Sequence, residues 1–500
     1  MKIALISLYL FKSLSTRQLS AFLKQNNQEV YEIYFKELKM NDLDKPTRKE
    51  IKLLKNLLKK LNPDIIGLSI NSSLFTLAKQ LTKELRDLNK PIIWGGLHPT
   101  LCPEDCIKEE DMICIGEGEQ ATLNLLKNLE KNKPITNIKS IWVKKDKKIY
   151  KNKTINFIED LDSLPTPNYD NQNKFYILEN KIFRGDQIKN HKIFDIMMSR
   201  GYPYNCSYCN SSHLFSTQEG KKLRFRSIDN IIKELTQAKK QLKHIKRIRF
   251  WDNILSFKGE ELNYFARQYK TKINLPFECN LHPEVINDEL IRKLKKAGMD
   301  KMSTGIQDGS QKVRYEIFNR KVSNEQIIKA CKILQKNKIT PNFDIIINNP
   351  LVTEYDLKQA FKFLIKIPRP FNLIMYSLTH FPKTKLTEEL LARGIINKNQ
   401  IEGQSSKLIS KWRATQFQNN KHQFWNSIYS LISKNFIPKP IIIILSRSKF
   451  LKKHSKSLNI FAFIANIIKI FQLGIIKLLR GEMDIAVFKR YKNLKRITTK

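Results

Sequence analysis

Short apolar runs alternate with segments of helical periodicity along the first 130 residues. Within Lys49–Leu61, for example, apolar side chains recur every three or four positions, which is the spacing of one helix face. This alternation predicts a doubly wound parallel sheet that binds ligands at the carboxyl ends of its strands. The predicted strands are Lys2–Ser7, Glu29–Ile33, Asp64–Ile70, Pro91–His98 and Asp111–Ile115, and Ser72 and Ser73 are the predicted caps of a helix over Leu74–Leu88.

A second alternation begins at Lys192 and repeats six times. Each predicted strand ends in polar residues or glycine, as is typical of strands that carry an active site at their carboxyl ends. The pattern predicts an open, six-stranded TIM-like β/α barrel. Its strands are expected at Ile193–Met198, Ile245–Trp251, Phe277–Leu281, Lys301–Ile306, Asn342–Ile347 and Asn372–Leu378.

The remaining segments divide the chain into four regions. We expect a sheet domain over residues 1–133, a linker with short strand-like pieces over 134–190, the barrel over 191–398 and a helical region over 399–500. In the last region, Leu458–Leu479 is predicted to form an amphipathic helix with a basic edge. Such a helix can lie on an anionic membrane surface or can cap the barrel, and both interpretations remain open.

The composition narrows the class of protein. The net charge is +43, but the lysines are scattered along the chain and no RNA-binding module is visible, so a nucleic-acid partner is not expected. The seven cysteines are too few for a secreted disulfide framework. No signal peptide is recognised and no stretch of twenty residues is wholly apolar. We therefore expect a cytoplasmic protein, with association with the inner face of the membrane as an open alternative.

The candidate chemistry centres on Cys206 and Cys209, which lie on a loop after a predicted strand. Their spacing lets two thiolates converge on one metal centre. The run from Ser199 to Cys209, Ser-Arg-Gly-x-Pro-Tyr-Asn-Cys-Ser-Tyr-Cys, resembles the Cys-x-x-x-Cys-x-x-Cys motif of the radical SAM superfamily, with Tyr202 at the position of the first cysteine. Further pieces follow in family order: Arg224-Phe-Arg-Ser, Phe250-Trp-Asp-Asn, Gly305-Ile-Gln-Asp-Gly-Ser, Asn319-Arg320 and Thr379-x-Phe-Pro-x-Thr384.

This resemblance implies a 4Fe-4S cluster held by cysteine thiolates, with S-adenosylmethionine chelating the remaining iron. It also implies a set of residues that bind S-adenosylmethionine. Tyr208 would pack on the adenine. The other members of the set are Trp251, Asp252 and Asn253 after the second barrel strand, and Gln307, Gly309 and Ser310 after the fourth.

The first domain resembles the cobalamin-binding domain that precedes the barrel in many radical SAM enzymes. The matching pieces are Pro63-Asp-Ile-Ile-Gly-Leu-Ser, Trp94-Gly-Gly-Leu-His-Pro-Thr and Ile115-Gly-Glu-Gly-Glu. The Asp-x-His-x-x-Gly element is absent after the first strand, so cobalamin would bind without a protein histidine on the cobalt. A domain that binds nothing remains an alternative. The implied cobalamin-binding residues are Ser69, Ser72, Gly95, Gly96, His98, Gly116 and Glu117.

Tyr202 leaves three interpretations open, because a phenol is a hard, weakly acidic substitute for a thiolate. The chain can be a cluster-free relative, a thiol from elsewhere can complete the site, or the tyrosine can be a recent change. We expect a radical SAM enzyme that uses a 4Fe-4S cluster, cobalamin and an external electron donor. Its expected reaction is methyl transfer to, or a related radical modification of, an unactivated carbon in a small or lipid-like metabolite. The alternative is a non-catalytic cobalamin- or nucleotide-binding relative.

Overall fold

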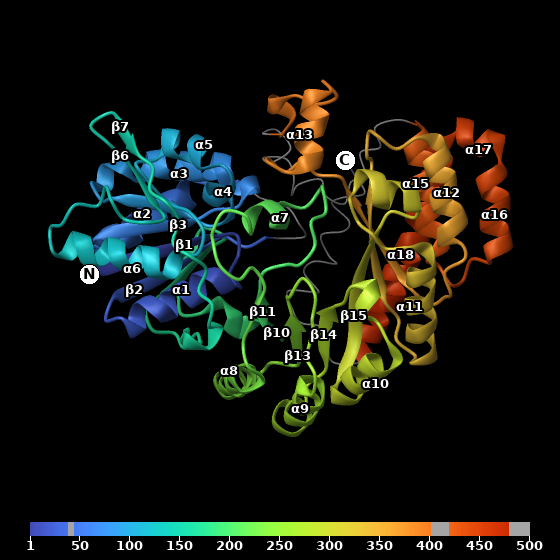
Figure 1. The fold of residues 1–500 in the computed structure, drawn as a ribbon, viewed down its shortest axis with the longest axis horizontal. Helices are drawn as coiled ribbons and strands as arrows, with labels where there is room; N and C mark the ends of the chain where they lie inside the picture. Colours follow the sequence, from blue (N-terminus) through green and yellow to red (C-terminus); the bar gives the residue numbers. More distant parts are fainter. Residues whose placement is uncertain (39–44, 402–419, 480–500) are drawn as a thin grey trace. The chain divides into compact units, whose positions relative to one another are not determined.

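The computed structural model describes residues 1–38, 45–401 and 420–479, which fall into two compact units (Figure 1). The described parts of Met1–His191, Met198–His244 and His380–Ser410 form one unit, here called the N-terminal unit. The described parts of Lys192–Met197, Ile245–Thr379 and Lys411–Lys500 form the other, here called the barrel unit. The segment that carries Cys206 and Cys209 therefore belongs to the N-terminal unit.

The centre of the N-terminal unit is a parallel sheet with the strand order β5-β4-β3-β1-β2. Ile66 and Ile65, which are consecutive on β3, belong to different hydrophobic clusters, as expected when both faces of a strand are covered. The doubly wound fold is thus confirmed. The strands are β1 (Lys2–Leu8), β2 (Glu29–Phe35), β3 (Ile65–Ser69), β4 (Ile92–Gly95) and β5 (Met112–Cys114), and the helices are α1 (Leu14–Gln25), α2 (Arg48–Leu61), α3 (Phe75–Leu85), α4 (Leu97–Leu101), α5 (Pro103–Glu109) and α6 (Gly118–Glu130).

Residues 134–190, which we expected to form a linker, extend this sheet at both edges. The hairpin of β6 (Ile141–Lys145) and β7 (Lys148–Tyr150) joins β5 antiparallel. On the other side, β8 (Lys174–Leu178) joins β2 in parallel, and β9 (Lys181–Arg184) turns back antiparallel. The strand-like pieces of this segment thus pair within the sheet, while the domain boundaries themselves stay a prediction.

Two local predictions at the carboxyl edge of the sheet are wrong. The strand predicted to reach His98 ends at Gly95, because Gly96 has a φ of +99° and the chain then enters α4. Ser72 and Ser73 do not cap the next helix. They lie inside a short 3₁₀ turn, and α3 begins after Leu74 without a side-chain cap.

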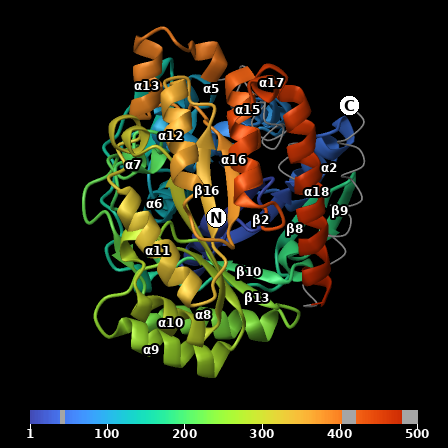
Figure 2. The same ribbon diagram turned by 90° about the vertical axis from the view of Figure 1, so that its right-hand side faces the viewer.

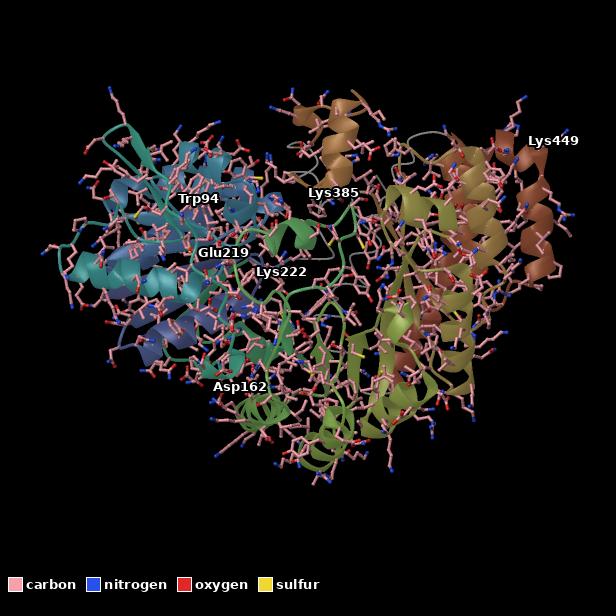
Figure 3. All side chains as sticks on the ribbon, viewed as in Figure 1. Trp94, Asp162, Glu219, Lys222, Lys385 and Lys449 are labelled. Carbon is pink, nitrogen blue, oxygen red and sulfur yellow. The ribbon has the colours of Figure 1, made fainter. Side chains whose placement is uncertain are left out.

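The cysteine segment is framed by a two-stranded antiparallel ribbon of β11 (Ser199–Arg200) and β12 (Arg224–Phe225). Gly201 leaves the ribbon with a φ of +112°, and a Cβ atom there would lie 1.9 Å from the carbonyl oxygen of Lys222. Only glycine fits this close approach. Glu219 and Lys222, which are labelled in Figure 3, lie on the stretch of chain that leads back into β12. The nearby helices of this unit are α7 (Asn210–Leu214), α8 (Ile228–Gln241) and α13 (Lys385–Ala392).

The barrel unit confirms the predicted six parallel strands, in the order β10-β13-β14-β15-β16-β17. Within this sheet each strand pairs with the barrel strand that follows it in sequence, and the first and last strands do not pair. This is the arrangement of an open β/α barrel. The strands are β10 (Ile193–Ile196), β13 (Arg247–Phe250), β14 (Phe277–Asn280), β15 (Met299–Gln307), β16 (Asn342–Ile347) and β17 (Asn372–Ser377), and the helices of this unit along the barrel are α9 (Glu261–Gln268), α10 (Asp288–Ala297), α11 (Asn324–Lys336) and α12 (Glu354–Leu364).

The C-terminal helices pack on the barrel and on one another (Figure 2). Leu458 and Ala462 of α18 share one buried cluster with Phe343 of β16 and Leu364 of α12. The predicted helical region is therefore present, and one face of α18 caps the barrel. No helix among the described residues is long and apolar enough to cross a membrane. The helices are α15 (Asn420–Ile432), α16 (Lys439–Arg447), α17 (Lys449–Lys453) and α18 (Ser455–Leu479).

Candidate active site

Three loops meet at the carboxyl edge of the first sheet, after β3, β4 and β5. Ser69 ends β3 and Gly95 ends β4, and the Ile70 amide donates to the Gly95 carbonyl oxygen at 2.8 Å. A Cβ atom on Gly96 would lie 3.0 Å from the Ile70 carbonyl oxygen, so this exposed position stays without a side chain. The structure therefore brings the predicted Ser69, Gly95 and Gly96 together as one partly exposed edge of backbone, here called the glycine edge.

His98 lies beneath this edge rather than at its rim. The ring is buried, its Nδ1 atom is 3.1 Å from the Ser72 hydroxyl, and the ring of Phe75 lies 4.5 Å away. Burial lowers the pKa of His98 to about 4, so the imidazole is neutral near pH 7. Its Nε2 atom is buried without a hydrogen-bond partner among the described residues. The structure brings the predicted pair His98 and Ser72 into contact.

Gly116 and Glu117, which follow β5, are in contact with the segment that carries the cysteines. The Glu117 amide donates to Gln218 Oε1 at 2.9 Å, and a Cβ atom on Gly116 would lie 2.3 Å from the Gln218 amide group. The Glu117 carboxylate is 3.1 Å from Arg200 Nη1 and 3.0 Å from Arg224 Nη1. Burial opposes its ionisation, but the Arg224 hydrogen bond and the Arg200 charge outweigh burial and hold the pKa of Glu117 below its ordinary value. A cobalamin contact by these two residues stays a prediction.

Cys206 and Cys209 lie in one tight turn. The Cys209 amide donates to the Cys206 carbonyl oxygen at 3.1 Å, and Cys209 then precedes the first residue of α7. Cys206 is buried, while Cys209 and Tyr208 are half-buried. The ring of Tyr202 is half-buried and lies 5.5 Å from the ring of Tyr204.

The turn is fixed from a second side by α13. The Leu386 amide, in the first turn of α13, donates to the Ser207 carbonyl oxygen at 2.9 Å. Thr384 caps this helix by accepting from the Thr387 amide. The motif Thr379-x-Phe-Pro-x-Thr384 thus ends in the cap of a helix that contacts the cysteine turn.

In the barrel unit, the predicted residues after β13 are held by charged neighbours. The indole N–H of Trp251 donates to Asp195 at 2.8 Å, and the guanidinium of Arg249 stacks on the indole at 4.4 Å. Trp251 nevertheless remains 47% exposed, so it keeps a free face. Asp252 is buried and Asn253 is exposed.

The predicted residues after β15 form a strained turn. Gln307 has a φ of +70°, and the Ser310 amide donates to Asp308 at 2.7 Å. Gly309 is close to α12, because a Cβ atom there would lie 2.7 Å from the Ala360 Cα atom. Burial raises the pKa of Asp308 to about 7. Binding of S-adenosylmethionine by the residues after β13 and β15 stays a prediction.

Two family models match the chain. The B12 binding domain model matches residues 9–126, which span most of the parallel part of the first sheet. The Radical SAM superfamily model matches residues 196–364, which run from the end of β10 through the cysteine segment to the end of α12. The chain is a radical SAM protein with an N-terminal B12-binding domain. The cofactors that go with these two kinds of domain are S-adenosylmethionine with a 4Fe-4S cluster, and cobalamin.

Two proteins named as methyltransferases are similar to this chain in sequence. An uncharacterized methyltransferase of Pyrococcus horikoshii is 25% identical over 347 residues, which are 68% of this chain and 72% of the relative. Bacteriochlorophyllide d C-8(2)-methyltransferase of Chlorobaculum tepidum is 23% identical over 347 residues, which are 67% of this chain and 69% of the relative.

Two solved structures share the fold of this radical SAM protein. The radical S-adenosylmethionine methyltransferase TsrM of Kitasatospora setae, with tryptophan substrate and a SAM analogue bound, has a TM-score of 0.63 at 12% identity and covers 79% of this chain and 76% of its own. The cobalamin-dependent S-adenosylmethionine radical enzyme OxsB has a TM-score of 0.63 at 17% identity and covers 97% of this chain and 76% of its own.

The glycine edge fits cobalamin. Gly95 and Gly96 would offer backbone without side chains to a flat, bulky ring, and the Ser69 hydroxyl lies close to Gly96. The neutral His98 adds an unengaged ring nitrogen behind the same edge. These features match a large, mostly uncharged ligand with hydrogen-bonding groups at its periphery.

The donor set at the cysteine turn falls one thiolate short of the cluster. Cys206 and Cys209 supply two soft ligands, and Tyr202 stands where the third thiolate is expected. Within residues 1–38, 45–401 and 420–479 no group of three or more His, Cys, Asp or Glu side chains could hold a metal ion. Cys102 and Cys114 are buried, and burial raises the pKa of each thiol to about 12, which disfavours the thiolate.

Sequence reasoning gave no structural role to the four residues that anchor the cysteine segment: Arg200, Gln218, Arg224 and Glu119. A signal was present, because two acids of the Gly-Glu-Gly-Glu piece match two arginines that flank the cysteines. Their pairing joins positions 81 to 107 residues apart along the chain. Only the fold shows that these charges meet.

Proposed function

We propose that this radical SAM protein is a cobalamin-dependent methyltransferase, or an enzyme of closely related radical chemistry, that modifies an unactivated carbon of a small or lipid-like metabolite. Both sequence relatives are methyltransferases by name. The observation that carries the proposal is the joining of the glycine edge and the cysteine segment within one compact unit, through Glu117 and its two arginines. An enzyme that passes groups between cobalamin and S-adenosylmethionine needs both cofactors in reach of each other.

The residues of this chain have separable roles in that proposal. Gly95 and Gly96 hold the face of the cobalamin ring, and Ser69 and Ser72 hold its polar periphery. Trp251 offers its exposed indole face to the adenosine part of S-adenosylmethionine, with Arg249 and Asp195 fixing the plane of the indole. Cobalamin, when bound, supplies a carrier for a methyl group. The protein's contribution is to bind, orient and exclude water.

A methyl-transfer assay tests the proposal. The protein is loaded with cobalamin, chemically reduced to the cob(I)alamin state without oxygen, and given S-adenosylmethionine labelled at the methyl group. We expect labelled methylcobalamin and one S-adenosylhomocysteine for each methyl transferred. Gly95→Val should abolish the product, because the added side chain enters the glycine edge, whereas Gly394→Asn, at an exposed left-handed position with open space, should not. Tight cobalamin binding with no methyl transfer would reject the methyltransferase proposal.

The two-thiolate donor set favours a second candidate function. A chain that keeps the glycine edge but cannot assemble a cluster would be a non-catalytic cobalamin- or nucleotide-binding relative. An active enzyme would also draw on an external electron donor. Iron analysis after anaerobic reconstitution separates the two candidates, because the binding protein would retain cobalamin and no cluster.

An apolar face of α18 supports a peripheral contact of this protein with an anionic membrane. Leu458, Ala462 and Ala465 of α18 are buried against the barrel. The opposite side of the helix carries large apolar side chains that are 43–61% exposed: Ile460, Phe461, Phe463, Ile464, Ile467, Ile468 and Ile475. In a 3.6-residue helix these exposed positions fall on one side, so they form a continuous stripe, here called the α18 stripe.

The positive charge of the residues around the α18 stripe favours an anionic membrane as its partner. Residues 439–479 contain eight Lys or Arg residues and no Asp or Glu. Lys449 lies at the outer end of the helical region (Figure 3). Large exposed apolar patches mark interaction sites, and an apolar stripe with a basic flank fits the surface of a bilayer that contains anionic lipid. We place this contact on the cytoplasmic side, where the free thiols are stable.

Liposome flotation tests the contact with the full chain. The wild type should float with vesicles of phosphatidylcholine and phosphatidylglycerol and much less with phosphatidylcholine alone. Phe463→Ser combined with Ile467→Ser should reduce flotation about tenfold or more, since each removes buried apolar area at the bilayer. The matched pair Ile182→Ser and Phe183→Ser, on the exposed strand β9, should not. Equal flotation of the two double variants, or dimerisation through the stripe without lipid binding, would overturn the membrane contact.

A further inference from the structure

A path of two hydrogen bonds, one peptide bond and the ion pairs of Glu117 leads from the glycine edge to the cysteine segment. The Thr100 hydroxyl donates to the Gly96 carbonyl oxygen at 2.8 Å, and it accepts from the Gly116 amide at 3.0 Å. Glu117, the next residue, accepts from the Ile158 amide at 2.9 Å. The backbone of the glycine edge and Glu117 are therefore joined by two short, partly buried hydrogen bonds and one peptide bond.

The carboxylate of Glu117 is the point at which this path meets the cysteine segment. Arg200 and Arg224 flank the cysteines on opposite strands of the β11–β12 ribbon, and both contact Glu117. Arg200 Nη2 also contacts Glu119 at 2.6 Å. Arg224 is 1% exposed, and its guanidinium also stacks on Phe157 at 4.4 Å. A buried guanidinium needs its counter-charge, so the position of the ribbon depends on Glu117.

We propose that Glu117 is a positioning residue that couples occupancy of the glycine edge to the order of the cysteine segment, residues 199–225. The inference rests on the binding of cobalamin in the proposed function. A ligand seated on Gly95 and Gly96 restrains the Gly96–Thr100 loop, Thr100 restrains Gly116, and Glu117 then holds Arg200 and Arg224 in one arrangement. The cysteine turn between the two arginines is ordered as a consequence. In this inference the Glu117 carboxylate is engaged by Arg200, Arg224 and the Ile158 amide and does not contact the ligand, which departs from the cobalamin contact expected from the sequence.

Hydrogen–deuterium exchange of the full chain, with and without hydroxocobalamin, tests this coupling. In the wild type, cobalamin should slow amide exchange across residues 199–225 by about fivefold or more, which is the usual size of coupling between sites. Glu117→Gln should still bind hydroxocobalamin, but the slowing across residues 199–225 should disappear. Glu117→Asp, which keeps the charge on a shorter side chain, should restore part of it.

Glu104→Gln is the matched control, because Glu104 also pairs with a cation, Lys151, but at an exposed site of the same unit. Glu104→Gln should show the same slowing of exchange across residues 199–225 as the wild type. Should Glu117→Gln fail to fold, Arg200→Gln removes the more exposed partner and is expected to lose the same protection. The inference would be overturned if Glu117→Gln kept the full protection of residues 199–225. It would also be overturned if Glu117→Gln lost cobalamin binding, because that loss would place Glu117 in the ligand site. A wild type that binds no hydroxocobalamin would overturn the proposed function as well, whereas binding without protection of residues 199–225 would overturn the coupling alone.

Discussion

Arg200 and Arg224 face each other across the β11–β12 ribbon, and their guanidinium groups share the carboxylate of Glu117. Two like charges placed directly opposite each other on neighbouring strands repel. Glu117, together with Glu119, neutralises them in a largely buried setting. The ribbon that frames the cysteines is therefore stable only while the first sheet presents these two carboxylates.

Removing one charge of this cluster should cost more than removing the pair. Glu117→Gln leaves Arg224 buried without its counter-charge, and we expect the free energy of unfolding to fall by about 3 kcal/mol. The double variant Glu117→Gln with Arg224→Met should recover most of that loss. Urea denaturation of the two single variants and the double variant measures the coupling energy. The exposed Glu104→Gln should change stability by less than about 0.5 kcal/mol, and an additive double variant would contradict the buried ion-pair account.

Gly201→Ala should destabilise the cysteine segment. The added Cβ atom would lie 1.9 Å from the Lys222 carbonyl oxygen at a φ of +112°, so the ribbon must open to admit it. We expect a loss of about 3 kcal/mol and faster amide exchange across residues 199–225. Gly394→Ala also has a positive φ, but it has open space and should cost only about 1 kcal/mol. Equal losses at the two glycines would show that backbone conformation alone, and not the close approach, explains Gly201.

Tyr202→Cys should raise the iron content of the anaerobically reconstituted protein. The substitution supplies the thiolate that the cysteine turn lacks, and a complete site should hold about four irons per chain. Iron and sulfide analysis, with an electron paramagnetic resonance spectrum of the reduced protein, measures the change. Tyr204→Cys is the control, because its ring lies beside that of Tyr202 but outside the motif position. If iron content does not rise, or rises equally in the control, the missing thiolate is not the defect.

Ionisation of the buried Glu110 carboxyl should lower the free energy of unfolding as the pH rises. Burial raises the pKa of this carboxyl from 4.5 to about 7, and its Oε2 atom has no hydrogen-bond partner in the part of the chain that the structure describes. The folded state thus holds the proton more tightly than the unfolded state. Between about pH 4.5 and pH 7 the unfolded chain binds fewer protons, so stability falls by up to about 3 kcal/mol and then levels off.

Glu110→Gln should remove this part of the pH dependence. The variant should match the wild type near pH 4.5 and exceed it at pH 8, as measured by urea denaturation at both values. Glu104→Gln, which alters an exposed carboxylate, should follow the wild-type profile. A variant that tracks the wild type across this range would show that Glu110 ionises freely in the folded protein.

Much of the fold follows from the apolar pattern. The strand predicted over Asn342–Ile347, for example, has the bounds that the structure shows. Errors gather at the carboxyl edge of the first sheet, where the predicted strand overran Gly95. The sequence Trp-Gly-Gly-Leu-His continues an apolar run, but the positive φ of Gly96 ends the strand. A local pattern does not reveal which glycine adopts that conformation.

The site was predictable in its residue types and not in its contacts. Cysteine spacing and family motifs singled out the turn at Cys206 and Cys209, and they also exposed Tyr202 as the departure. The helix over Leu458–Leu479 was expected, but the pattern left open whether it would cap the barrel or lie on a membrane surface. Packing of Leu458 and Ala462 shows that one face of this helix caps the barrel.

By itself, the sequence determined the two α/β domains, the six-stranded barrel and the cysteine pair, because hydrophobic periodicity and short motifs are local properties of the chain. Only the tertiary structure decided that Glu117 pairs with Arg200 and Arg224, that His98 is buried beside Ser72, and that strands within residues 134–190 extend the first sheet. These are pairings between distant positions. Their partners are selected by burial and charge neutralisation in the folded chain, which no spacing along the sequence encodes.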